Sequence, residues 1–138
     1  MTIAEWTVLT AVLLFLLTVA PIKVIVRPAF DNSNPRDPGF YKSGIASRAL
    51  GAHLNGIETF PFFAFAVLLA EFRHQPQAWI DALAIAFLCL RLLYVVAYLS
   101  NRPTTRTLIW NLGFAVNAAI FLMPLWMTAG MAKLSPWL

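Results

Sequence analysis

The sequence has few charged residues: Asp, Glu, Lys and Arg make up 12% of its 138 residues, about half of their share in an ordinary soluble domain. Cysteine is almost absent, since Cys89 stands alone, and this excludes an internal disulfide and a cysteine-based zinc site. By contrast, 60% of the residues are hydrophobic. A soluble domain of this length could not bury so much apolar surface, so the sequence predicts an integral membrane protein.

Four apolar stretches are long enough to cross a bilayer as helices, which takes about 20 residues each. They run over about residues 6–26, 45–71, 78–99 and 107–131. The first is longer than the core of a signal peptide and lacks a basic segment before it, so a membrane helix is favoured there over a cleaved signal. We predict an all-α fold in which residues 1–138 form one membrane-embedded, antiparallel, up-and-down four-helix bundle.

Basic residues gather on one side of the predicted membrane. The first loop carries Arg27, Arg36 and Lys42, and the third loop carries Arg102 and Arg106. Cytoplasmic loops are rich in Lys and Arg, so we expect both loops in the cytoplasm and both termini on the opposite side, in a bacterial inner membrane. The net charge of +4 suits anionic membrane lipids and requires no nucleic-acid partner.

The second stretch carries polar residues where hydrocarbon should surround it. Each residue of a helix advances by about 100°, which places Arg48, Asn55 and Glu58 in one stripe and His53 well off it. Polar groups inside a membrane face other helices, a ligand or water, because lipid cannot satisfy them. The stripe is therefore predicted to face the protein interior.

The third stretch has a matching polar face, with Arg91, Tyr94 and Tyr98 close together on the helix. Arg91 lies at about the depth of Glu58 in the membrane. An unpaired charge at the centre of a membrane helix costs about 2.5–3.5 kcal/mol even on lenient scales. We therefore predict that Arg91 and Glu58 neutralise each other, directly or through a shared ligand.

Two interpretations of these polar groups remain open. They could tie helices together by hydrogen bonds and ion pairs, or they could line a cytoplasm-facing cleft for a polar ligand. The fourth stretch adds Arg106, Trp110 and Asn117 on one face, which favours the cleft, although Asn117 by itself is typical of an interhelical hydrogen bond. Small residues spaced four apart, such as Gly51 after Ser47, allow close helix packing within a bundle or between copies.

The segments RALGAHLNGIETFPFF and RLLYVVAYLSNRPTTR resemble the MAPEG family, the membrane-associated proteins of eicosanoid and glutathione metabolism. The family's second-helix pattern is approximately R-x-x-R-A-x-x-N-x-x-E-x-x-P. It is matched by Arg48, Ala52, Asn55, Glu58 and Pro61, and the third helix matches at Arg91 and Tyr98.

The resemblance implies a homotrimer that binds glutathione between protomers and acts on lipophilic substrates as a transferase or peroxidase. The residues that it assigns to glutathione binding are Arg27, Arg48, Asn55, Glu58, Arg91, Tyr94 and Tyr98. Arg106 would activate the thiol, with Arg102 as the competing candidate, and no metal is implied. A cation beside a thiol lowers the thiol pKa from about 8.5 and raises the thiolate fraction.

The sequence departs from the family pattern at Gly51, where the family has an arginine that helps to hold glutathione. Losing a hydrogen bond to a charged group costs about 1.5–3 kcal/mol, unless Lys23 or Lys42 replaces it. This departure keeps a non-catalytic lipid- or protein-binding role open as the alternative. A proton-coupled transporter with Glu58 as its titrating group is a third hypothesis.

Overall fold

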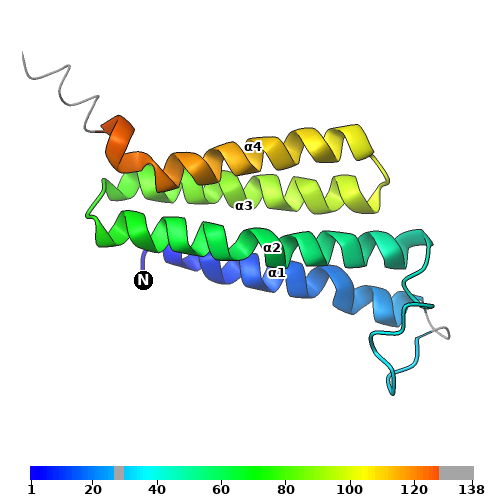
Figure 1. Cartoon of the computed structure of the whole chain (residues 1–138). Coiled ribbons are helices and arrows are strands. Elements are labelled where there is room, and N and C mark those ends of the chain that lie inside the picture. Colours follow the sequence, from blue (N-terminus) through cyan, green and yellow to red (C-terminus); the bar gives the residue numbers. More distant parts are fainter. Residues whose placement is uncertain (27–29, 128–138) are drawn as a thin grey trace, which may run out of the picture.

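The computed structural model describes residues 1–26 and 30–127, and these residues fold into four long helices without a strand. The helices are α1 (Ile3–Ile25), α2 (Gly44–Phe72), α3 (Gln77–Leu99) and α4 (Pro103–Phe121), and they lie side by side with alternating direction (Figure 1). The predicted all-helical membrane fold is confirmed, because α1, α2 and α3 are long and apolar enough to cross a membrane.

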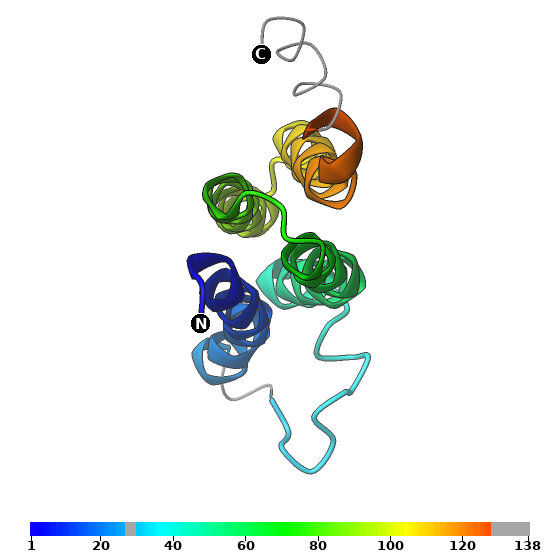
Figure 2. The ribbon, with the colours of Figure 1, turned by 90° about the vertical axis from the view of Figure 1, so that its left-hand side faces the viewer.

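The helices are not arranged as a square. The closest packing is between α1 and α2 and between α3 and α4, and α2 and α3 join the two pairs. Viewed end-on, α2 and α3 lie in the middle of an elongated cross-section, with α1 and α4 at its two ends (Figure 2). This arrangement leaves the side of α2 that lies next to α4 less tightly covered than the side next to α1.

The bounds of the fourth helix differ from those of the predicted fourth span. The expected span was 107–131, whereas α4 covers Pro103–Phe121 and does not meet the length-and-hydropathy criterion for a membrane span that the other helices meet. Pro103 occupies the first turn, where proline favours a helix start, and the polar first turn lowers the hydropathy. α4 ends at Phe121, and after a turn at Leu122 the chain is helical again over residues 123–127, where Pro124 lies in the first turn. Residues 128–131 lie outside the described residues.

The turn between α3 and α4 is fixed by hydrogen bonds of the backbone. Asn101 has a positive φ of 54°, and the amides of Asn101 and Arg102 donate to the carbonyls of Tyr98 and Ala97 at 3.1 and 2.9 Å. This is the Schellman pattern that satisfies the last carbonyls of a helix. Because Pro103 then starts α4 at once, the turn places Arg106 in the first turn of α4, beside the end of α3.

The end of the molecule that holds the start of α1, here called the N-terminal end, is tied together by polar residues. Thr2 and Glu5 form a capping box at the start of α1, and the Asp81 carboxylate of α3 accepts a hydrogen bond from the Ala4 amide at 2.9 Å. Exposed tryptophans lie at this end, and Trp79 contacts Trp126 edge-on with ring centroids 5.8 Å apart. Indole rings at this position are typical of a membrane interface.

The half of the molecule next to the N-terminal end contains the main hydrophobic core, which we call the packed half. Phe63 of α2 stacks on Phe87 of α3 with ring centroids 4.1 Å apart. Ile80 and Ile120, from α3 and α4, are fully buried in the same cluster. The small residues of α2 at every third or fourth position, such as Ala66 and Ala70, bring the helices close together.

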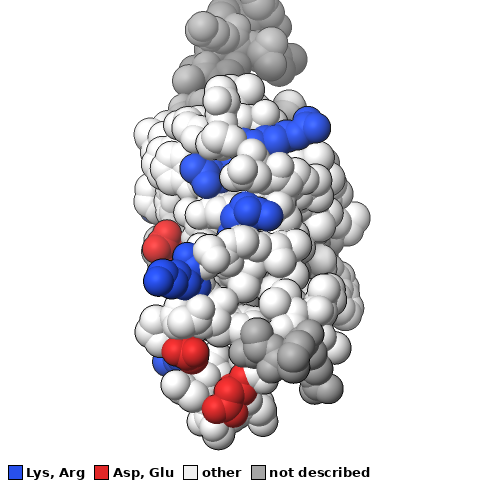
Figure 3. All heavy atoms as spheres, turned by 90° about the vertical axis from the view of Figure 1, so that its right-hand side faces the viewer, with Lys and Arg blue, Asp and Glu red and all other residues white. Residues whose placement is uncertain are grey.

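The opposite end, here called the loop end, holds the long α1–α2 connection and the α3–α4 turn (Figure 1). Lys and Arg side chains gather over this end (Figure 3), which confirms that the two basic loops share one side of the molecule. Within the long loop, Ser33 donates two hydrogen bonds to the Asp31 carboxylate, and these lower the pKa of Asp31. The Pro- and Asp-rich segment forms turns, as expected.

Candidate functional site

A chain of hydrogen bonds links the charged residues of α2 and α3. Arg91 donates from Nη1 to Asn55 Oδ1 at 3.0 Å, and Asn55 donates from Nδ2 to Glu58 Oε2 at 3.5 Å. Arg91 and Glu58 therefore interact through Asn55. In the part of the chain that the structure describes, no ion pair within 4.0 Å joins the two charges, so of the two predicted alternatives the direct one is not seen, and the link runs through Asn55.

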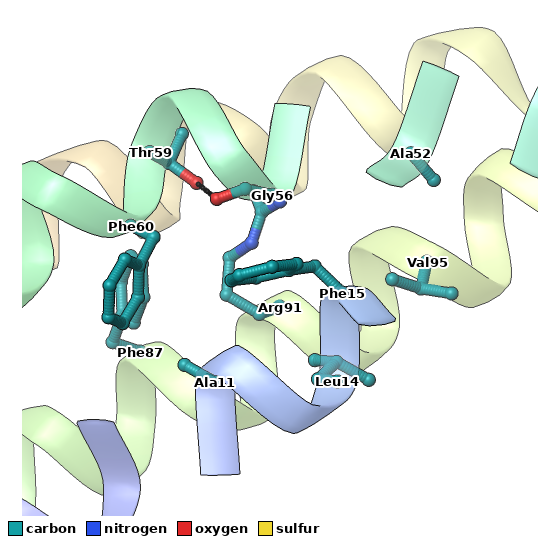
Figure 4. A pocket seen from close by; sticks show the side chains of 10 residues that line it. All are labelled: Ala11, Leu14, Phe15, Ala52, Gly56, Thr59, Phe60, Phe87, Arg91 and Val95. Atoms are coloured by element: carbon teal, nitrogen blue, oxygen red, sulfur yellow. Dashed lines mark hydrogen bonds between the residues drawn. The ribbon is translucent and has the colours of Figure 1, made fainter. Parts of the chain in front are cut away.

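The two ends of this chain have very different surroundings. Arg91 is 7% exposed, whereas Glu58 is exposed on the surface of the single chain. Figure 4 shows the Arg91 side chain extending from α3 toward Gly56 of α2, with Phe15 of α1 beside it. The cavity at this point has a volume of about 20 Å³, which is close to the space for one water molecule.

Aromatic rings connect Arg91 to Arg106. The Arg91 guanidinium lies 4.4 Å from the centre of the Tyr94 ring, and Tyr94 contacts Tyr98 edge-on at 5.6 Å. The Arg106 guanidinium lies 4.5 Å from the centre of the Tyr98 ring. A cation is attracted to the face of an aromatic ring, most strongly where water is excluded. The contacts of Tyr94 and Tyr98 therefore help to hold Arg91 in the interior and Arg106 at the loop end.

Two neighbouring cavities open between α2, α3 and α4. The outer cavity has a volume of about 430 Å³ and is lined by Gly51, Leu54, Asn55, Glu58, Tyr94, Tyr98, Arg106, Thr107 and Trp110. The inner cavity, of about 200 Å³, shares Asn55, Glu58 and Trp110 with it and is lined by Arg91 as well. Five of the residues predicted for the site thus meet at the outer cavity, and Arg91 lies just behind it.

The outer cavity distinguishes the two candidates for the thiol-activating arginine. Arg106 is half-buried and lines the cavity. Arg102 is exposed and, as the N-cap residue of α4, stands at the turn and outside the cavity lining. By geometry, Arg106 is the better placed of the two for a ligand in the outer cavity.

One predicted residue, Arg48, does not join the site in this structure. Arg48 donates from Nε to the Leu99 carbonyl at 3.0 Å and so binds the C-terminal end of α3, where a cation suits the helix dipole. Arg48 lies in the same helical stripe as Asn55, as expected, but its side chain binds the end of α3 and does not line the outer cavity. Arg27 lies outside the described residues.

A sequence model of the MAPEG family matches residues 3–126. The chain belongs to the MAPEG family. No curated protein and no solved structure matches the chain. Among the described residues of this MAPEG chain, no group of three or more His, Cys, Asp and Glu side chains could hold a metal ion. The groups available at the outer cavity are instead a guanidinium, a carboxylate, an amide and two phenols, which suit a polar organic ligand.

In this MAPEG chain, Tyr98 occupies the space beside Gly51, where the family motif has an arginine. A Cβ atom at position 51 would collide with the Tyr98 hydroxyl oxygen and would lie 2.7 Å from Tyr98 Cζ. The sequence showed only that the arginine was missing. The structure adds that Tyr98 packs directly on the α2 backbone, a contact that depends on the distance between helices and so cannot be found from spacing along the chain.

Small residues of α2 also bring α1 close to it. A Cβ atom at Gly56 would lie 3.3 Å from Phe15 Cγ, and the next residue along this side of α2, His53, pairs through Nδ1 with the Phe15 carbonyl at 2.8 Å. The small residues Gly51 and Gly56 therefore allow close packing within the chain, against α3 and α1 respectively. His53 faces α1 and is outside the polar stripe, as predicted.

Proposed function

We propose that this MAPEG protein is a glutathione-dependent membrane transferase or peroxidase acting on lipophilic substrates. One observation carries the proposal: Arg106, Tyr98 and Glu58 line a single cavity of about 430 Å³. A cavity of this size falls within the range of ligand pockets. It offers a cation for a thiol, a carboxylate for an ammonium group and phenolic hydroxyls for peptide groups.

The chemistry proposed for the site begins with the glutathione thiol beside Arg106. A cation stabilises the thiolate and lowers the thiol pKa from about 8.5, so more of the nucleophilic form exists at neutral pH. Glu58 and Asn55 would bind the ammonium and amide groups, and Arg27 would meet a carboxylate at the mouth of the cavity. The thiolate sulfur would then attack the carbon of a lipophilic electrophile, form a C–S bond and expel the leaving group, for example chloride.

We propose further that the site is completed in a homotrimer. Glu58 is at the middle of α2 and is exposed on the single chain. A carboxylate left against hydrocarbon at this depth would be costly, so another protomer or a bound ligand must cover it. A site between protomers satisfies both requirements at once, with membrane lipid around the assembly.

The proposed orientation follows from the basic loop end. Lys and Arg gather there, and basic residues mark the cytoplasmic side. The outer cavity, which reaches Arg106 at this end, would then open toward cytoplasmic glutathione, with both termini on the other side of a bacterial inner membrane.

The test is a titration of the detergent-purified protein with glutathione, followed by thiolate absorbance and by conjugation to a chlorinated aromatic compound. We expect a thiolate signal at millimolar glutathione that disappears in Arg106→Ala. Arg102→Ala is the matched control, because Arg102 is an exposed arginine one turn away and outside the cavity lining. The absence of a thiolate signal from the wild-type protein would rule out the hypothesis that it is a glutathione-dependent enzyme.

The second candidate function is that of a non-catalytic ligand-binding protein. Gly51 favours it, because Tyr98 fills the space that a glutathione-binding arginine would need. In that case glutathione would bind weakly or not at all, and the outer cavity would hold a lipid or a segment of a partner protein. The same titration separates the two functions.

A further inference from the structure

The inner cavity contains a buried polar group that the proposed function does not use. Asn117 of α4 is 2% exposed and lines this cavity. In the described part of the chain, its Oδ1 atom has no hydrogen-bond partner. The sequence led us to expect an interhelical hydrogen bond here. A buried amide oxygen without a partner is destabilising, so a donor group on a bound molecule would be stabilised by pairing with it.

The walls of the inner cavity are mainly aromatic and aliphatic. Trp110 stacks on Phe114 with ring planes 12° apart and centroids at 5.7 Å, and Phe62 contacts Phe114 at 5.9 Å. Leu90 and Ile109 complete the apolar lining. A molecule in this cavity must therefore have an apolar body, preferably a flat one that can pack against aromatic rings.

The charges around the cavity favour a neutral molecule. Arg91 and Glu58 both line it, so either sign of charge on a ligand would meet a like charge. Arg91 already donates to Asn55 at 3.0 Å. The amide of Asn117 offers an acceptor on one atom and donors on the other, and its orientation can be reversed by rotation. A hydroxyl group, which both donates and accepts, pairs with either orientation.

We propose that the inner cavity is a binding site for a small, neutral, lipophilic molecule with a hydroxyl group, of which a substituted phenol is the simplest representative. An apolar cavity of about 150 Å³ accepts benzene, and the inner cavity has a volume of about 200 Å³, which leaves room for the hydroxyl and a short substituent. The site is formed by α2, α3 and α4 of one chain. It shares Asn55, Glu58 and Trp110 with the outer cavity, but it can be tested in the absence of glutathione and without measuring the proposed activity.

The experiment compares 4-ethylphenol with 4-ethylanisole, its methyl ether, which has no hydroxyl to donate. Thermal unfolding of the detergent-purified protein is followed as each compound is titrated, since a ligand that binds the folded state raises the unfolding temperature. We expect the phenol to act at a concentration about tenfold lower than the ether. Equal potency of the two compounds, or no saturable shift with either, would overturn the proposal.

Asn117→Leu tests the residue itself, because leucine is similar in size and cannot form the hydrogen bond. We expect this variant to bind both compounds equally, whereas Asn111→Leu should keep the tenfold preference. Asn111 is a matched control on the same helix: it is exposed, and its amide donates to the Thr107 carbonyl. Comparing variants with the same compound cancels its partition into detergent. A preference retained in Asn117→Leu would contradict the proposal.

Gly113→Ala provides a second test in case Asn117→Leu does not fold. A methyl group at Gly113 meets no heavy atom within 4 Å and projects from a residue that lines the inner cavity. We expect a folded protein whose affinity for both compounds is lowered severalfold, with the preference for the phenol retained. Unchanged affinity would show that the compounds bind elsewhere and would reject the site.

Discussion

The helices α2, α3 and α4 pack in two different ways along their length. In the packed half, Phe63 and Phe87 stack at 4.1 Å, and Ile80 is fully buried between the helices. In the other half, here called the polar half, the helices enclose Arg91 and two cavities. The stability of the protein is thus expected to depend on the packed half, and its ligand binding on the polar half.

The largest effect on stability should come from breaking the packed half. Phe63→Ala removes a fully buried ring, and such changes cost about 3–5 kcal/mol in soluble cores. We expect a smaller but still large loss here, because lipid replaces water as the reference solvent, measured by thermal or SDS unfolding in micelles. Phe72→Ala, a phenylalanine on the same helix that is 80% exposed, should change stability by less than about 0.5 kcal/mol.

Arg91→Met tests whether the polar half is functional or merely structural. Arg91 is buried and forms no ion pair among the described residues, so Arg91→Met removes the cost of burying a charge at the expense of one hydrogen bond to Asn55, and the unfolding temperature should hardly fall. Glutathione affinity should drop by about ten- to a hundredfold, because Asn55 loses the charged partner that orients it and such bonds are worth about 1.5–3 kcal/mol. An unfolded variant, or unchanged affinity, would identify Arg91 as a structural residue.

Much of this division could be predicted from the sequence. The helical periodicity placed Asn55 and Glu58 on one face of the second helix and Arg91 on a polar face of the third, which depends only on the geometry of each helix. That the two faces meet followed from the cost of leaving polar groups in lipid. The hydrogen-bond partner of the Arg48 side chain could not be predicted, because it is the Leu99 carbonyl on another helix. The end of α4 was missed because the apolar run continues through the break before Pro124.

A pair of glycine substitutions sharpens the comparison within the polar half. In Gly51→Ala, the new methyl group would displace Tyr98 and with it the contact to Arg106 at 4.5 Å. Cation–aromatic contacts are worth about 0.5–2 kcal/mol, so we expect glutathione affinity to fall by about two- to thirtyfold. Gly113→Ala meets no neighbour and should instead stabilise α4 by about 0.5–1 kcal/mol.

These two variants are read by glutathione titration and by thermal unfolding in parallel. If Gly51→Ala binds glutathione as tightly as the wild type, Tyr98 has room to move, and the close contact with α2 does not shape the site. If Gly113→Ala destabilises the protein, the space beside Gly113 is filled by something that a methyl group must displace.

Arg48→Gln should have the smallest effect on stability and on glutathione affinity, and it tests whether Arg48 contributes to helix packing or to ligand binding. Arg48 was predicted to hold glutathione, yet it donates to the Leu99 carbonyl at 3.0 Å, and a cation at the end of a helix contributes about 0.3–1 kcal/mol. We expect a loss of this size in thermal stability, with glutathione affinity changed by less than about threefold. If affinity instead falls as far as in Arg91→Met, Arg48 leaves Leu99 when the ligand arrives, and the polar half extends to the end of α3.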